Sequence, residues 1–530
     1  MFFKKNYENL IYLSSFIFII FFYLYSKNSL FSHWSDILDQ DVTLIYNSIL
    51  IGSTEPQQYL DHPAFTTFFI LNIFYKIGYL VNLIEIKNFE EFIAHSNKND
   101  VLQRIHNISQ FVHLLYSLIL ILLFKRIIYR ILNDHLSSFF LSLIFLLSPS
   151  FIFLFDIIRS EILSIIFLFL FLICLEYSLR KNLLFIILAG IFFVCALLAK
   201  VQIILCIFPI LLIFIIYNYN FKGNKQIYVS KITKIILNIL FVIFIIAIID
   251  NYFYKRIDKI FFLFIVICLI LTFSILDKKL TLQNNTNLSL FLFFVGCSIA
   301  IIGFKFLSKV GIAYFHPALI DIITSPISQM SNISTGYGIG RADNFEYLYK
   351  IKNFFLYVRE TRSDKGIETI SFLFEKFNIF TYFLSFLFLC YLFIKKNYLK
   401  TILILTLTIS IISIILIFNF RPYFFYDIYI LPLNLLLISI LIQNIPYKKI
   451  FTFSIFLIYF IFNSSNINTY LDQKRVSGVL NYKVNLDGNM KIICKDEEIM
   501  NKNSYMRYWH KKYDEKFLRD LCSSYFQKIN

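Results

Sequence analysis

Charged residues are scarce in this chain of 530 residues. They make up only 16% of it, against 58% hydrophobic residues, and the mean hydropathy is +0.70. A composition this apolar excludes a water-soluble globular protein and is typical of a polytopic membrane protein. The formal net charge of +17 is spread over loops between apolar runs, so we expect no nucleic-acid partner.

The chain also lacks the cysteine and histidine spacings of a metal or redox motif, because none of its eight cysteines forms a CxxC pair or a Cys/His set. Six cysteines fall in apolar stretches, where a thiol behaves as a small hydrophobe; these are Cys174, Cys195, Cys206, Cys268, Cys297 and Cys390. Cys494 and Cys522 lie in polar sequence near the C-terminus, where an oxidising compartment would allow a disulfide. Whether they pair is an open question at this point.

Repeats and transporter signatures are absent as well. No self-similarity at solenoid periods is present, and no inverted pair of broken apolar segments marks a transporter's central site. Gly336, Gly338 and Gly340 do not follow a strand and precede a helix, so they do not form a phosphate-binding loop.

Apolar runs long enough to cross about 30 Å of hydrocarbon predict an all-α polytopic membrane protein with about 13 transmembrane helices. The first run lacks a small-residue cleavage site, so we expect it to remain as a helix. The predicted spans are 10–26, 105–124, 137–155, 161–178, 183–199, 201–217, 235–250, 260–276, 287–304, 377–394, 401–418, 427–444 and 450–463.

Lys and Arg residues predict the orientation, because they are retained on the cytoplasmic side of short loops. We expect the protein to lie in the inner (plasma) membrane with its N-terminus on the cytoplasmic side. The basic loops on that side contain Lys125–Arg130, Lys278–Lys279, Lys395–Lys400 and Lys448–Lys449. The other, periplasmic side holds two long hydrophilic segments and a small C-terminal tail. We therefore expect a transmembrane domain over 1–463, with outer loops at 27–104 and 305–376, and an outer tail over 464–530.

The first outer loop gathers acidic residues beside the bilayer, where a carboxylate is costly unless it has a function. Val42–Leu50 has apolar residues at helical spacing behind Asp39 and Asp41, which predicts a short surface helix with an acidic cap. The run Ala64–Leu80 predicts a helix that lies along the membrane interface and does not cross it. We place the candidate active site in this loop.

These segments resemble the GT-C superfamily of integral-membrane glycosyltransferases, in the branch related to protein O-mannosyltransferases and lipid A aminoarabinose transferase. Over residues 1–210 the likeness covers the arrangement, and beyond that it covers the topology. In the family the acidic pair is often adjacent, whereas Gln40 separates it here, so which Asp is catalytic stays open. The residues that carry the resemblance are Asp39 and Asp41, Tyr46, Tyr59 with Asp61, His62 and Pro63, Arg159 and Glu161, Lys200, and Arg421, Tyr426 and Pro432.

The resemblance implies inverting transfer of a monosaccharide from a polyprenyl-phosphate donor to a hydroxyl of a glycolipid, polysaccharide or protein. Such chemistry needs a general base and cations that hold the departing phosphate. Asp41 or Asp39 is the candidate base. Arg159, Lys200 and Arg421 are the candidates for the phosphate, and the candidate substrate-binding residues are His62, Asp61, Tyr46, Glu161 and Tyr426. The sequence establishes no cofactor. Mg²⁺ or Mn²⁺ stays an alternative, because Asp39, Asp41 and Glu161 are hard oxygen ligands.

Plainer interpretations stay open. Asp39 and Asp41 are also explained as helix caps, and His62 as a turn residue before Pro63. Arg159 and Glu161 are two positions apart and share no helical face, so each is also explained as an anchor that snorkels to the membrane interface. Lys200 and Arg421 have the same alternative explanation. Three other function classes stay open: a lipid-linked saccharide flippase or other transporter, an O-antigen polymerase or ligase, and a membrane scaffold. A transporter needs ionisable residues within the spans.

Overall fold

The computed structural model describes residues 12–21, 41–57, 64–180, 182, 184–221, 286–317, 319–320, 376–395, 398–418, 427–443 and 445–472. All secondary structure in these ranges is helical, without a strand, as the sequence predicts. After a first helix over 12–21, the elements are α2 (Asp41–Gly52), α3 (Phe65–Leu80), α4 (Phe89–Ala94), α5 (Lys98–Leu132), α6 (His135–Leu146), α7 (Pro149–Asp156), α8 (Glu161–Arg180), α9 (Phe185–Ala199), η1 (Val201–Ile203), α10 (Ile204–Phe221), α13 (Thr286–Lys309), α18 (Lys376–Ile394), α19 (Tyr398–Phe418), α20 (Asp427–Ile442) and α21 (Lys448–Asp472).

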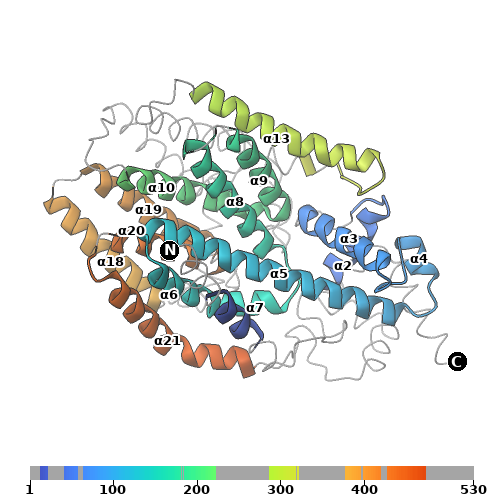
Figure 1. Ribbon diagram of the computed structural model, residues 1–530, viewed down its shortest axis with the longest axis horizontal. Helices are drawn as coiled ribbons and strands as arrows, with labels where there is room; N and C mark the ends of the chain where they lie inside the picture. The colour runs from blue at the N-terminus through green and yellow to red at the C-terminus, as the bar shows by residue number, and fades with distance from the viewer. Residues whose placement is uncertain are drawn as a thin grey trace, which may run out of the picture.

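Helix α5, of 35 residues, runs through the bundle with α4 at one end (Figure 1). It packs against α6, α8 and α20. On one side of it, α8 packs against α9 and α9 against α13, which forms an edge of the molecule, whereas α21 packs on α6 near the opposite edge. A buried apolar core connects these helices.

The apolar helices support a membrane protein. In the described part of the chain, three segments are long and apolar enough to cross a membrane, and these are Asp100–Leu132, Glu161–Ser178 and Phe291–Lys309. Shorter apolar helices account for most of the other predicted spans. The predicted spans 235–250 and 260–276 and the tail beyond residue 472 lie outside the described residues, so the number of spans stays a prediction.

The predicted single span 137–155 is two helices, α6 and α7, with a break at Leu147 and Ser148. Pro149 has no N–H to donate and is suited to the first turn of a helix. The Ser148 hydroxyl accepts from the Phe151 amide at 3.3 Å and caps the new helix. The sequence SPS therefore ends one helix and starts the next.

The turn between α5 and α6 is set by an Asn–Asp pair. Asn133 has φ 52° in the left-handed region, which asparagine tolerates, and the Asp134 carboxylate caps α6 by accepting from the Ser137 amide at 2.8 Å. Partial burial of Asp134 opposes its ionisation, but the Ser137 hydrogen bonds and the charges of Lys449 and Lys448 outweigh it and lower the pKa of Asp134.

Two predicted inner loops meet at this turn. Lys448 donates to the Leu132 carbonyl at the end of α5, and the Lys449 ammonium lies 3.7 Å from the Asp134 carboxylate. Two of the basic loops that the sequence assigns to one side of the membrane are therefore at one end of the bundle.

The α9–α13 contact depends on two glycines. A Cβ at Gly190 would lie 2.2 Å from the Phe293 carbonyl oxygen, and a Cβ at Gly296 would lie 2.0 Å from the Ile187 carbonyl oxygen. Because both neighbours are backbone atoms, a side chain there has to push the helices apart. Small residues that permit such close approach are a general feature of helix packing in membranes.

We expect Gly190→Ala and Gly296→Ala each to lower the melting temperature, by an amount equivalent to about 1–3 kcal/mol, because they overpack this contact. Gly303→Ala, on the same helix α13, is the matched control and is expected to be neutral or stabilising, because a Cβ at Gly303 would have nothing within 4 Å. Thermal unfolding of the purified protein in detergent measures the melting temperature of each variant. Equal losses for all three variants would contradict the close contact.

Candidate functional site

Three predicted site residues meet in a buried charge cluster. The Lys200 ammonium lies 2.9 Å from Oε1 of Glu161, and Nε of Arg159 lies 3.6 Å from Oε2 of the same carboxylate. The Arg159 side chain is 4% exposed, that of Lys200 is 1% exposed and that of Glu161 is 0% exposed. The structure thus brings one carboxylate between two cations that come from different parts of the chain.

Arg159 reaches Glu161 because it does not lie in a helix. Helix α7 ends at Asp156 and α8 begins at Glu161, and residues 157–160 connect them as a bend. Two side chains two positions apart would diverge on a helix, but they converge across this bend. The interpretation of Arg159 and Glu161 as separate snorkelling anchors is therefore wrong, since both side chains are buried and contact each other.

Lys200 enters the cluster from a second break. It ends α9 and precedes η1, with extended dihedrals of φ −156° and ψ 117°. Its amide donates to the Ala196 carbonyl at 3.0 Å, and its carbonyl accepts from the Ile203 amide at 3.2 Å. The backbone at this break is hydrogen-bonded on both sides, so Lys200 projects from a defined position.

Other buried polar groups lie close to the cluster in sequence. The neighbouring Gln202 side chain is buried. The Ser164 hydroxyl, one turn into α8, donates to the Glu161 carbonyl at 2.7 Å and lies 3.2 Å from the Tyr429 hydroxyl of α20. Helix α20 is therefore joined to α8 one turn from the charge cluster.

The predicted outer segments lie together. The Tyr314 amide, after α13, donates to the Ile51 carbonyl at the end of α2 at 2.8 Å, and the Lys76 ammonium donates to the Ile312 carbonyl at 2.8 Å. The Thr66 hydroxyl, near the start of α3, donates to the Cys195 carbonyl of α9 at 3.1 Å. Because Cys195 is just over one turn before Lys200, the first outer loop reaches the same region as the charge cluster.

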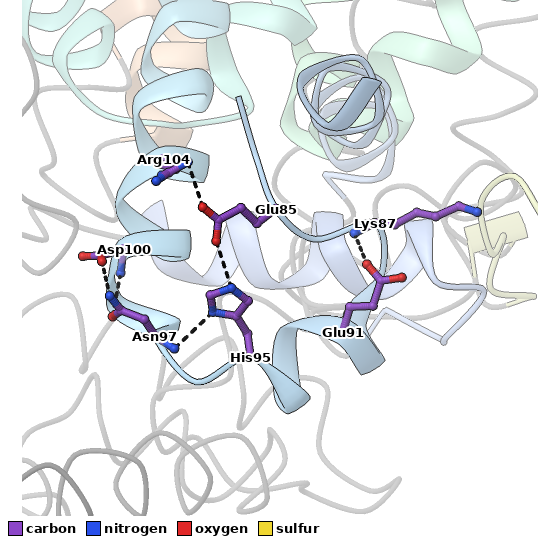
Figure 2. Close-up of polar contacts among 7 residues, drawn as sticks. All are labelled: Glu85, Lys87, Glu91, His95, Asn97, Asp100 and Arg104. Atoms are coloured by element: carbon purple, nitrogen blue, oxygen red, sulfur yellow. Dashed lines mark hydrogen bonds and ion pairs between the residues drawn. The ribbon is translucent and has the colours of Figure 1, made fainter. Parts of the chain in front are cut away.

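The rest of the first outer loop is fixed to α5 by polar contacts. Glu85 accepts from both Arg104 and His95, at 3.2 Å and 3.0 Å, and the Asn97 amide donates to Nδ1 of His95 (Figure 2). The Asn88 side chain caps α4 by accepting from the Glu91 amide at 2.8 Å. These contacts fasten the segment between α3 and α5 onto the first turns of α5.

Helix α2 confirms one prediction and corrects another. The stretch after the acidic pair is a helix as predicted, but Leu44–Ile51 is buried, so it is not a surface helix. The Tyr46 ring lies 5.6 Å from that of Phe89, which ties this candidate to the packing of α2 on α4 instead of to the charge cluster. Burial arises because α2 packs on α3 and α5.

Several predicted site residues are not placed by the structure. Asp39, Asp61, His62, Arg421 and Tyr426 lie outside the described residues, and α2 begins at Asp41, whose side chain is likewise undescribed. The candidate base therefore stays a prediction. Among the described residues no group of three or more His, Cys, Asp and Glu side chains is arranged to hold a metal.

Polar residues inside the predicted span 105–124 were not identified from the sequence. His106, Ser109, His113 and Ser117 of α5 are all buried. Their spacing of three or four residues places them on one helical face. Polar side chains at helical spacing inside an apolar run are the signal that would have found this face. This face contacts the end of α7, because Nε2 of His113 lies 2.7 Å from the Leu154 carbonyl. The end of α7 directly precedes the bend that carries Arg159.

Comparisons of the chain with known protein families, with curated proteins and with solved structures gave no match. The geometry of the site and the sequence pattern therefore carry the functional argument.

We expect Glu161→Gln to destabilise the protein by about 3–5 kcal/mol, because it leaves two buried cations together. Lys200→Met costs less, because Glu161 keeps Arg159 as a partner. The double variant loses less than the sum of the two single variants, since the two residues interact directly. Glu85→Gln, which breaks an ion pair whose partners are half exposed, is the control and costs at most about 1 kcal/mol. Chemical unfolding in detergent tests this, and additivity of the two buried changes would refute it.

Proposed function

We propose that this protein is a membrane glycosyltransferase that moves a monosaccharide from a polyprenyl-phosphate donor to a hydroxyl acceptor on the outer face of the membrane. The observation that supports it is the cluster of Arg159, Glu161 and Lys200. Two cations lie beside one carboxylate in a buried setting, and such cations suit contact with an anion such as a lipid phosphate.

The proposed reaction is a single displacement. The acceptor oxygen attacks the anomeric carbon of the sugar, the bond from that carbon to the phosphate oxygen breaks, and the polyprenyl phosphate leaves with the electron pair. The acceptor proton passes to Asp41 or Asp39. Arg159 and Lys200 stabilise the negative charge that develops on the leaving phosphate, and attack opposite the leaving group inverts the anomeric configuration.

Transport of a lipid-linked saccharide is the second candidate function. The observation that favours it is the buried polar face of α5, which places His106 and His113 inside a helix long enough to cross a membrane. Ionisable side chains within a span are typical of transport pathways. A transporter moves the donor intact, whereas a transferase releases polyprenyl phosphate, so product analysis separates the two.

The experiment that tests the proposal is sugar transfer in proteoliposomes, with a panel of polyprenyl-phosphate sugars and a membrane extract as acceptor source. One of the two variants Asp41→Asn and Asp39→Asn removes the general base, and we expect that variant to lower kcat by about 10²–10⁴. Glu55→Gln changes an exposed carboxylate of the same loop and is expected to leave the rate unchanged. No transfer by the wild type with any donor, or full activity of both Asp variants, would contradict the assignment.

The orientation has its own test. In a background without native cysteines, Glu55→Cys should react with a membrane-impermeant maleimide added outside sealed cells, because this loop is predicted to face outward. Tyr447→Cys, at a position that is 72% exposed at the opposite, basic end of the bundle, should react only after permeabilisation. The reverse labelling pattern would place the site on the cytoplasmic side.

A further inference from the structure

We propose that His113 is a positioning residue that holds the bend at residues 157–160, and with it Arg159, in place. His113 lies on α5 and is buried. Its Nε2 is 2.7 Å from the Leu154 carbonyl. A carbonyl oxygen only accepts hydrogen bonds, so Nε2 must carry the proton and donate.

The acceptor is a group that its own helix leaves unsatisfied. Leu154 lies in the last turn of α7 (Pro149–Asp156), and the last four carbonyls of an α-helix have no intrahelical partner. A buried carbonyl without a partner is costly. The His113 side chain, on a different helix, therefore supplies the hydrogen bond that the Leu154 carbonyl lacks in the last turn of α7, directly before the bend.

The other end of the bend has a corresponding brace. The Ser164 hydroxyl donates to the Glu161 carbonyl, so its oxygen is left to accept from the Tyr429 hydroxyl at 3.2 Å. The bend that carries Arg159 thus lies between a histidine of α5 and a tyrosine of α20. Because α20 also packs on α5, the two braces are joined to each other.

His113 is also within electrostatic range of the Glu161 carboxylate. A shift of the bend would change the position of Arg159 relative to this carboxylate, and binding groups have to be held within about 0.5 Å of their productive geometry to act. The expected consequence for lipid phosphate rests on the proposed function, whereas the brace itself rests on the observed contacts alone.

Substitutions at His113 separate the hydrogen bond from simple filling of space. His113→Gln keeps an N–H donor near the position of Nε2. His113→Asn is too short to reach the Leu154 carbonyl, and His113→Leu has no donor. Ser117→Ala, one turn further along α5, is the matched control, because the Ser117 hydroxyl is buried and donates only within its own helix, to the His113 carbonyl at 3.0 Å.

Two measurements read the outcome. The first is hydrogen–deuterium exchange at the amides of residues 157–161 in the purified full-length protein. The second is the affinity for a short-chain polyprenyl phosphate, measured by its effect on thermal unfolding. In His113→Leu and His113→Asn we expect the exchange to be about tenfold faster and the affinity about tenfold weaker, which corresponds to the loss of one buried hydrogen bond. His113→Gln and Ser117→Ala should stay close to the wild type.

The outcomes are distinguishable. If His113→Leu matches the wild type in both measurements, or if its exchange rises equally in α13, which packs on α9 on the side away from the bend, the positioning role is wrong. If the wild type has no affinity for polyprenyl phosphate, the proposed function fails, while the exchange data still decide whether His113 braces the bend.

Discussion

The bundle depends on the ion pairs that Glu161 forms with Lys200 and Arg159. Removing these charges from water is expensive, and the cost is offset only when the partners are held in good geometry. Here the partners come from the bend before α8 and from the break between α9 and η1. The cluster therefore joins two segments at the points where each departs from helical geometry. The regular helices around them supply the rigidity that keeps the charges paired.

The position of the cluster is as informative as its charge. Polar backbone that is not helical is tolerated inside a membrane bundle where protein buries it, and both breaks meet this condition. The outer segments, joined through Ile51, Tyr314 and Thr66, gather at the same region. A stabilising role alone would be served as well by apolar residues, which is why we interpret the retained charges as a binding site for an anionic group.

Much of the fold was predictable, because long apolar runs bounded by charges predict α8 and α9 to within two residues and α10 to within four. The site was predictable only in part. Arg159, Glu161 and Lys200 were each identified, but their meeting was not, since helical spacing separates the first two and only the bend at residues 157–160 lets them converge. His113 was missed because averaging hydropathy over α5 hides one buried polar face. The burial of α2 depends on packing against distant helices, which local periodicity does not contain.

The most direct test of this account is an experimental structure of the protein with a bound polyprenyl phosphate. We predict density for the phosphate within hydrogen-bond distance of the Arg159 guanidinium and the Lys200 ammonium, with the bend at residues 157–160 unchanged. Phosphate density at the basic end of the bundle near Arg130 and Lys448, with none at the charge cluster, would contradict it.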